Sequence, residues 1–161
     1  MLLKFFTKKK IIIELPISIY QSFGFSKIKT NSYSLKNERC GIVVGTRIDY
    51  EKINITHLIE DKTPLLQNPF QVLRVTSHIY PELIRLIENN GNIDYLGEWH
   101  THPNGPICAS WIDHSTMKEM VNNLEFGDLK WVILMIFLPD QKIVSYYYEN
   151  NNYSKIECNL I

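Results

Sequence analysis

The sequence has few of the features that mark a specialised class of protein. Its three cysteines, Cys40, Cys108 and Cys158, are an odd and sparse set for 161 residues, so we expect reduced thiols and a cytoplasmic protein rather than a disulfide framework. Lys plus Arg and Asp plus Glu both number 17. The chain therefore lacks the positive charge of a nucleic-acid-binding protein, and we expect no nucleic-acid partner.

Long apolar segments are also missing. The longest apolar run, Trp131–Leu138, has eight residues and fits a buried strand, whereas a membrane-spanning helix needs about 20. The N-terminal segment MLLKFFTKKK carries its apolar residues before its lysines, which is the reverse of a secretory signal. We therefore expect no membrane partner.

The composition is sufficient for one apolar core. Hydrophobic residues make up 45% of the chain, whose length is typical of a single domain, and no repeat or low-complexity linker divides it. We predict one domain over residues 1–161, of α/β class, with a mixed sheet and flanking helices. Apolar patterns predict strands at Lys10–Leu15, Gly41–Ile48, Ile53–Ile59, Tyr95–Thr101, Trp131–Leu138, Ile143–Tyr148 and, at the edge of the sheet, Tyr153–Cys158. Helices are predicted at Pro16–Phe23, His78–Glu88 and Trp111–Leu124, and Leu65–Phe70 is expected to be irregular.

The clearest chemical signal lies in the segment GEWHTHP and the helix start that follows it. His100 and His102 are two apart on a predicted strand, so their imidazoles project from the same face. A proline then ends the strand. Ser110 opens the next helix and Asp113 lies one turn in, so these two side chains also face the same way. Two histidines and one aspartate form a three-ligand zinc site with a position left for water, which is the catalytic pattern.

Each half of this pattern has a simpler interpretation. A His-x-His pair occurs by chance in many strands, and Ser110-x-x-Asp113 is also the pattern of a helix N-terminal capping box. Taken alone, the second pair favours a cap. The joint arrangement of strand, proline, loop and helix start directs these side chains to one point, and a cap is compatible with a metal site. The other histidines, His57, His78 and His114, are expected to be ordinary core or surface residues.

The segment HTHPNGPICASWID resembles the JAMM motif of the JAB/MPN metallopeptidases, which is His-x-His-Pro, six residues, then Ser-x-x-Asp. Glu38, just before the run CGIVVG, is similar to the upstream glutamate of that family, and the order of elements is similar over nearly the whole chain. The resemblance implies one Zn²⁺ ion held by His100, His102 and Asp113. It also implies that Glu38 is the general base and that Ser110 donates to the developing oxyanion.

Two carboxylates compete for the role of base. By strand alternation Glu98 shares a face with the two histidines, so proximity in the chain favours it. The resemblance favours Glu38 and implies that Glu98 lies behind the ligands or on the substrate wall. Trp99 points to the opposite face and is expected in the core, while the run Tyr146–Tyr148 is expected to divide between core and surface.

The wider context YLGEWHTHP resembles the prokaryotic JAB peptidases encoded beside ubiquitin-transfer-like enzymes in bacterial anti-phage operons of the CBASS type. This resemblance implies a deconjugating peptidase that cleaves after the C-terminus of a ubiquitin-like or nucleotidyltransferase (CD-NTase-type) protein joined to a target. A peptidase acting on a sulfur-carrier or small-molecule conjugate and a non-catalytic MPN scaffold are the alternatives. We expect the partner's extended tail to pair with an exposed strand edge, in a channel lined by Leu65–Val72 and Asn104–Ala109.

Overall fold

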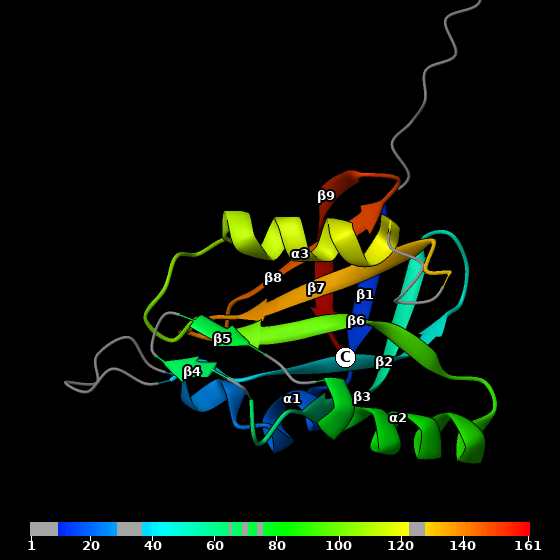
Figure 1. Cartoon of the computed structure of the whole chain (residues 1–161), viewed down its shortest axis with the longest axis horizontal. Coiled ribbons are helices and arrows are strands. Elements are labelled where there is room, and N and C mark those ends of the chain that lie inside the picture. The colour runs from blue at the N-terminus through cyan, green and yellow to red at the C-terminus, as the bar shows by residue number, and fades with distance from the viewer. Residues whose placement is uncertain (1–9, 29–36, 65, 69–70, 74–75, 123–127) are drawn as a thin grey trace, which may run out of the picture.

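The structure is a computed structural model that describes residues 10–28, 37–64, 66–68, 71–73, 76–122 and 128–161 (Figure 1). Within these residues, seven strands close into one sheet in the order β1-β3-β2-β6-β7-β8-β9, and β4 and β5 form a separate pair. Two helices pack against the outside of the closed sheet, which confirms the predicted α/β class. The strands are β1 (Ile12–Leu15), β2 (Cys40–Arg47), β3 (Lys52–Glu60), β4 (Leu66–Asn68), β5 (Gln71–Leu73), β6 (Asp94–Thr101), β7 (Trp131–Phe137), β8 (Ile143–Glu149) and β9 (Asn152–Leu160). The helices are α1 (Ile17–Ser22), the 3₁₀ turn η1 (Phe25–Lys27), α2 (Thr76–Asn90) and α3 (Trp111–Asn122).

Strand β9 is not an edge strand, so that prediction was wrong. One side of β9 pairs antiparallel with β8, and its other side pairs in parallel with β1. Strand β1 also pairs in parallel with β3, and the N-terminal strand thereby closes the sheet. Alternation of apolar residues along one segment does not reveal a partner at the other end of the chain.

The stretch that was expected to be irregular contains strand β4, which pairs antiparallel with β5. Leu65, Pro69 and Phe70 lie outside the described residues. The side-chain amide of Gln67 in β4 donates to the backbone carbonyl of Glu38, at 2.8 Å. The β4–β5 hairpin therefore lies beside Glu38, which the family resemblance implies is the base.

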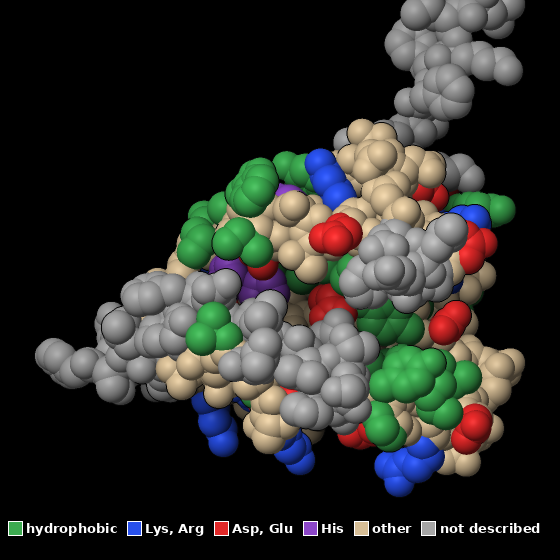
Figure 2. Space-filling view, in the orientation of Figure 1, with side chains coloured by type: hydrophobic (Ala, Val, Ile, Leu, Met, Phe, Trp, Pro, Cys, Tyr) green, Lys and Arg blue, Asp and Glu red, His purple; other side chains and the backbone are tan. Residues whose placement is uncertain are grey.

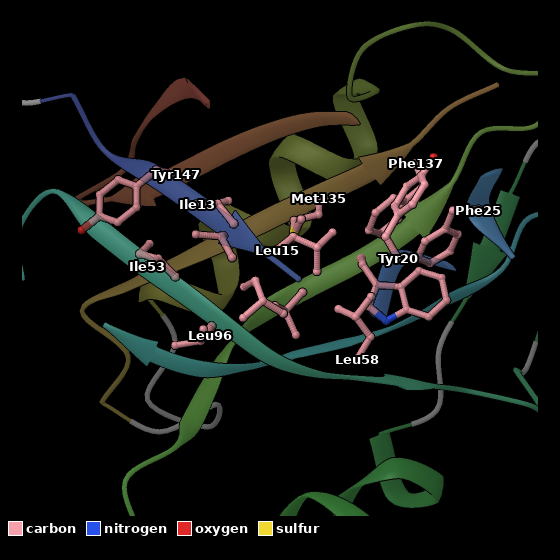
Figure 3. Packing of buried hydrophobic residues seen from close by; sticks show 14 residues of the cluster. Ile13, Leu15, Tyr20, Phe25, Ile53, Leu58, Leu96, Met135, Phe137 and Tyr147 are labelled. Atoms are coloured by element: carbon pink, nitrogen blue, oxygen red, sulfur yellow. The ribbon is translucent and has the colours of Figure 1, made fainter. Parts of the chain in front are cut away.

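The inside of the closed sheet is filled by apolar side chains (Figure 3). Aromatic rings from η1, β6 and β7 meet there: the rings of Phe25 and Phe137 are stacked with centroids 3.7 Å apart, and Trp99 packs edge-on against Phe25 at 5.3 Å. Trp99 is fully buried, as predicted, and its indole N–H donates to the carbonyl of Ile59. The inner face of β6 therefore packs against this core.

The outside of the sheet is covered by two helices that leave part of β6 between them (Figure 1). Helix α2 packs Ile79 and Leu83 against β2 and β3, whereas α3 packs Met117 and Met120 against β7 and β8. Tyr95 of β6 contacts both apolar clusters. No helix in the described part of the chain is long and apolar enough to cross a membrane.

The tyrosines of β8 differ from expectation because both faces of that strand are covered. Tyr147 points into the closed sheet, while Tyr146 and Tyr148 lie beneath α3. All three are buried, so the predicted division between core and surface was wrong. A strand covered on both faces loses the contrast between core and surface from which the division was predicted.

Candidate metal centre

His100 and His102 lie at the end of β6 on its outer face. Backbone pairing fixes the position of both residues, because His100 is paired with Cys40 of β2 and with Ile136 of β7, and the N–H of His102 donates to the carbonyl of Phe137. Both side chains are buried, and their Nε2 atoms are 2.9 Å apart. The predicted common face is therefore confirmed, and two imidazoles converge on one point.

Asp113 approaches this point from the first turn of α3. Its Oδ1 is 3.6 Å from Nε2 of His100, while its Oδ2 accepts the backbone N–H of Ser110 at 2.6 Å. The N–H of Asp113 in turn donates to Oγ of Ser110 at 3.1 Å. These reciprocal bonds are a capping box, so the simpler interpretation of Ser-x-x-Asp is correct and the cap also orients Asp113. One carboxylate oxygen holds the cap and the other faces the histidines.

The loop after β6 sets the orientation of the His102 ring. Nδ1 of His102 lies 2.9 Å from the carbonyl oxygen of Pro106, which can only accept, so Nδ1 carries the proton and Nε2 keeps its lone pair. A Cβ built on Gly105 would lie 3.4 Å from Cβ and Cγ of His102, so the loop backbone packs closely on the ring. A backbone carbonyl that fixes the tautomer is the usual companion of a metal-binding histidine.

The residues fit a metal ion such as zinc. One nitrogen from each of His100 and His102 and one oxygen of Asp113 all lie within 4.8 Å of one another; below, these three residues are the ligand trio. Two nitrogen ligands of a tetrahedral zinc are about 3.3 Å apart, which is close to the 2.9 Å between the two Nε2 atoms. The trio can therefore bind a metal through small adjustments, and the donor set leaves a fourth position open.

The electrostatic environment keeps His100 in the form that a metal requires. Burial lowers the pKa of His100 below its ordinary value, because a protonated ring would be poorly hydrated there. The negative charge of Asp113 opposes this shift, and His102 adds to it. The ring of His100 is therefore neutral near pH 7. Neutral imidazole is the form that binds zinc, so burial prepares the ligand before a metal arrives.

Glu38 lies beside the trio because of the register between β2 and β6. The ladder pairs Cys40 with His100, and the next rung joins Arg39 to Thr101, so Glu38 falls opposite His102. Its Oε1 is 4.0 Å from Nε2 of His102, and the side chain is buried. Burial, followed by the negative charge of Asp113, raises the pKa of Glu38 to about 8. A carboxyl group with this pKa is suited to exchange a proton near neutral pH.

Glu98, the rival carboxylate, is on the same face but further down the strand, opposite Ile42. Its Oε1 accepts the hydroxyl of Tyr95 at 2.7 Å, and it is not among the three residues of the trio. Gly97, with φ 149°, sits at an irregularity in the pairing of β2 with β6, which brings Tyr95 onto the same face as Glu98. The geometry therefore gives the carboxylate of Glu98 a tyrosine partner on its own strand, whereas Glu38 lies opposite His102.

The remaining histidines and Cys108 have other surroundings. Nδ1 of His57 lies 3.0 Å from Oγ1 of Thr56, and Nδ1 of His114 lies 2.8 Å from the hydroxyl of Tyr148. The ring of His114 is also stacked on Tyr153. The side chain of His78 lies outside the described residues, and Cys108 is exposed in the loop before α3. Neither His57 nor His114 belongs to the trio, as expected.

An apolar surface that the sequence pattern did not predict adjoins the site. Ile107, Trp111 and Ile112, here called the apolar rim, are 76%, 80% and 57% exposed and flank Ser110 along the chain. Figure 2 shows hydrophobic side chains gathered over one end of α3, above histidine and acidic side chains in a recess. The sequence pattern does not reveal this exposure, because large apolar residues such as Trp and Ile are ordinarily assigned to a buried face.

Comparisons with known proteins agree with this geometry. The family described as prokaryotic homologs of the JAB domain matches residues 28–148. Among solved structures, the solution structure of protein DSY2949 from Desulfitobacterium hafniense is similar in fold, with a TM-score of 0.61 and 17% sequence identity over 94% of this chain and 93% of the other. A search of curated proteins finds no match.

Proposed function

The chain belongs to the prokaryotic homologues of the JAB domain, and on that premise we propose that it is a zinc-dependent peptidase. One observation carries the proposal: the ligand trio converges from β6 and α3, and Glu38 lies 4.0 Å from His102. Three protein ligands with an adjacent buried carboxyl group match the composition of a hydrolytic zinc site. A scaffold without activity would not need this combination.

The residues around the trio have different roles in the proposed amide hydrolysis. A bound zinc ion would act as a Lewis acid and would lower the pKa of water. Glu38 takes a proton from the attacking water and returns it to the leaving amine. Burial raises the pKa of Glu38, which makes its carboxylate a stronger base than an exposed one. The hydroxyl of Ser110 accepts the N–H of Asp113, so its own hydrogen is available for the carbonyl oxygen of the substrate. Both roles remain predictions.

The surroundings of the site support a protein substrate. The apolar rim exposes three large side chains next to Ser110, and exposed apolar patches beside a site are typical of protein recognition. The loop and helix start at 103–112 contain no charged residue, so electrostatic attraction does not select the substrate there. The β4–β5 hairpin lies beside Glu38 and offers strand edges to an extended tail. We therefore propose cleavage after the C-terminal residue of a conjugated protein.

This proposal is tested by intact-mass analysis of products from a tail-linked protein fusion and from a matching short peptide, with and without a chelator. We expect cleavage directly after the tail of the fusion, slow cleavage of the peptide, loss of both with chelator and recovery with added zinc. Trp111→Ala should raise KM for the fusion alone. Ile48→Ala, which changes an exposed residue just after the far end of β2, should not. Equal rates on fusion and peptide would favour the small-conjugate peptidase.

The finer proposal is that the conjugated partner is a ubiquitin-like or nucleotidyltransferase protein of an anti-phage operon. It is supported by the resemblance of the YLGEWHTHP segment to such peptidases. Genes for a ubiquitin-activating-like enzyme and a nucleotidyltransferase beside this one would be the expected finding. Genes for sulfur-carrier synthesis in that place would contradict it.

A further inference from the structure

We infer that Arg39 is a positioning residue that holds Glu38 opposite His102. The inference rests on the proposed function, because it assumes that Glu38 is the base. It concerns a residue directly next to Glu38 whose side chain, by strand alternation, points to the other face of the sheet. The guanidinium of Arg39, the residue just before β2, bonds to both Glu60 and Phe23.

Glu38 needs such support because it lies beyond the regular pairing of β2. The ladder between β2 and β6 ends at Cys40 and His100. Two bonds extend it by one rung: the N–H of Arg39 donates to Oγ1 of Thr101 at 2.9 Å, and the N–H of Thr101 donates to the carbonyl of Arg39 at 2.9 Å. Thr101 lies between the two histidines in the chain, so a shift of Arg39 would move Glu38 relative to both ligands.

The guanidinium fixes that rung from three directions. Nε and Nη2 donate to the two carboxylate oxygens of Glu60 at 2.7 and 2.8 Å, and Nη1 donates to the carbonyl of Phe23 at 2.8 Å. The group also lies within 6.0 Å of the ring centres of Phe23, Phe25 and Trp99. The planar fork of arginine is suited to this bidentate and stacked arrangement.

Lysine cannot reproduce these contacts. Its ammonium is a single point of charge, so it could meet Glu60 or the Phe23 carbonyl but would lose the bidentate geometry and the stacking on the rings. The rung between Arg39 and Thr101 would then be free to shift, and with it the carboxylate of Glu38. An error of about 1 Å in the position of a catalytic group can lower turnover by as much as a hundredfold.

The test compares Arg39→Lys with Arg47→Lys in the zinc-loaded full chain. Arg47 is a matched control because it lies at the opposite end of β2, donates to the hydroxyl of Tyr147 and lies 4.7 Å from the ring centre of Trp131. For Arg39→Lys we expect kcat to fall about tenfold, with KM and zinc content unchanged. Arg47→Lys should leave kcat unchanged, although both variants lose a similar packed guanidinium.

Two further measurements decide whether Arg39 acts through Glu38. In a Glu38→Gln background, Arg39→Lys should cause no additional loss of kcat; a further tenfold loss would overturn the inference. A crystal structure of Arg39→Lys should show Glu38 displaced from His102, and an unchanged 4.0 Å separation would also overturn it. If Arg39→Lys does not fold, Glu60→Gln tests the same clamp, with the same expected fall in kcat.

The structural measurement separates this inference from the proposed function. If the wild-type chain and Glu38→Gln show the same turnover on every substrate tested, the function assigned to Glu38 is wrong. The position of Glu38 in the Arg39→Lys structure would still decide whether Arg39 holds it. Conversely, active wild-type protein with no displacement in that structure would reject only the role of Arg39.

Discussion

The two faces of strand β6 place neighbouring residues in opposite surroundings. On the inner face Trp99 is fully buried among aromatic rings, and its one polar atom has a backbone partner. On the outer face His100 and His102 are almost as deeply buried. They belong to neither of the apolar clusters that pack under α2 and α3. Burial alone therefore does not distinguish a core residue from a site residue. What distinguishes them is whether all their polar side-chain atoms have backbone hydrogen-bond partners, as in Trp99, or converge on a shared point, as in His100 and His102.

This comparison divides the expected effects of substitution. Changes on the inner face should lower the free energy of unfolding while leaving each folded molecule active. Changes on the outer face should remove metal or turnover with smaller effects on folding, because residues of a functional site are often held at a cost to stability.

The largest effect is expected on the outer face. The double substitution His100→Ala and His102→Ala should reduce zinc from one ion per chain to background and abolish peptidase turnover, since two of the three ligands are lost. Elemental analysis and circular dichroism of protein purified without added metal measure metal and fold separately. Full zinc content in this variant would show that the trio is not the metal site.

The next effect separates the two carboxylates. Glu38→Gln should keep zinc but lower kcat by about a hundredfold or more, because a proton acceptor is lost and no ligand is. Glu98→Gln should change kcat much less, since the carboxylate of Glu98 is already hydrogen-bonded to Tyr95. Zinc analysis and steady-state kinetics of both variants provide the measurement. An inactive Glu98→Gln with an active Glu38→Gln would reverse the assignment.

The elements that local patterns determine could be predicted from the sequence. The strand with His100 and His102 and the helix start with Ser110 and Asp113 lie within two residues of their predicted bounds. Strand alternation then placed both histidines and Glu98 on one face, as the structure has them. Each of these features depends on residues that are near one another in the chain, where the geometry of a strand or a helix turn is fixed.

Features that depend on pairing between distant segments could not be predicted in this way. Proximity in the chain favoured Glu98 as the base, but the register of β2 against β6 places Glu38 beside His102. The closure of the sheet by β1 and β9 is a similar case. Only the family resemblance indicated Glu38. Neither the local sequence pattern nor the resemblance indicated Arg39, whose partners Phe23 and Glu60 are 16 and 21 residues away in the chain.

The inner face of β6 provides the third prediction. Trp99→Phe should lower the free energy of unfolding by about 2 kcal/mol, because it removes buried volume and leaves the carbonyl of Ile59 without the indole N–H. Zinc content and kcat per folded molecule should stay within about twofold of wild type, since the ring points away from the trio. Denaturant unfolding with parallel kinetics measures both. Loss of zinc at unchanged stability would contradict the division between the two faces.

The smallest effect is expected at Ser110, which belongs to both categories. Its Oγ accepts the N–H of Asp113, so Ser110→Ala should lower stability by about 1 kcal/mol through loss of the cap. If its hydrogen also serves the substrate carbonyl, kcat should fall as well, while zinc stays bound through His100, His102 and Asp113. Thermal melts, zinc analysis and kinetics of the same preparation are the measurement.

Ser110→Thr is the matched control, because it keeps a hydroxyl that can both cap the helix and donate to a substrate. We expect Ser110→Thr to recover most of the stability and most of the turnover that Ser110→Ala loses. A melting shift with normal turnover in Ser110→Ala would mean that the hydroxyl acts only as a cap. Slowed turnover with an unchanged melting temperature would mean that the cap seen in the structure contributes little, and that the hydroxyl acts mainly on the substrate.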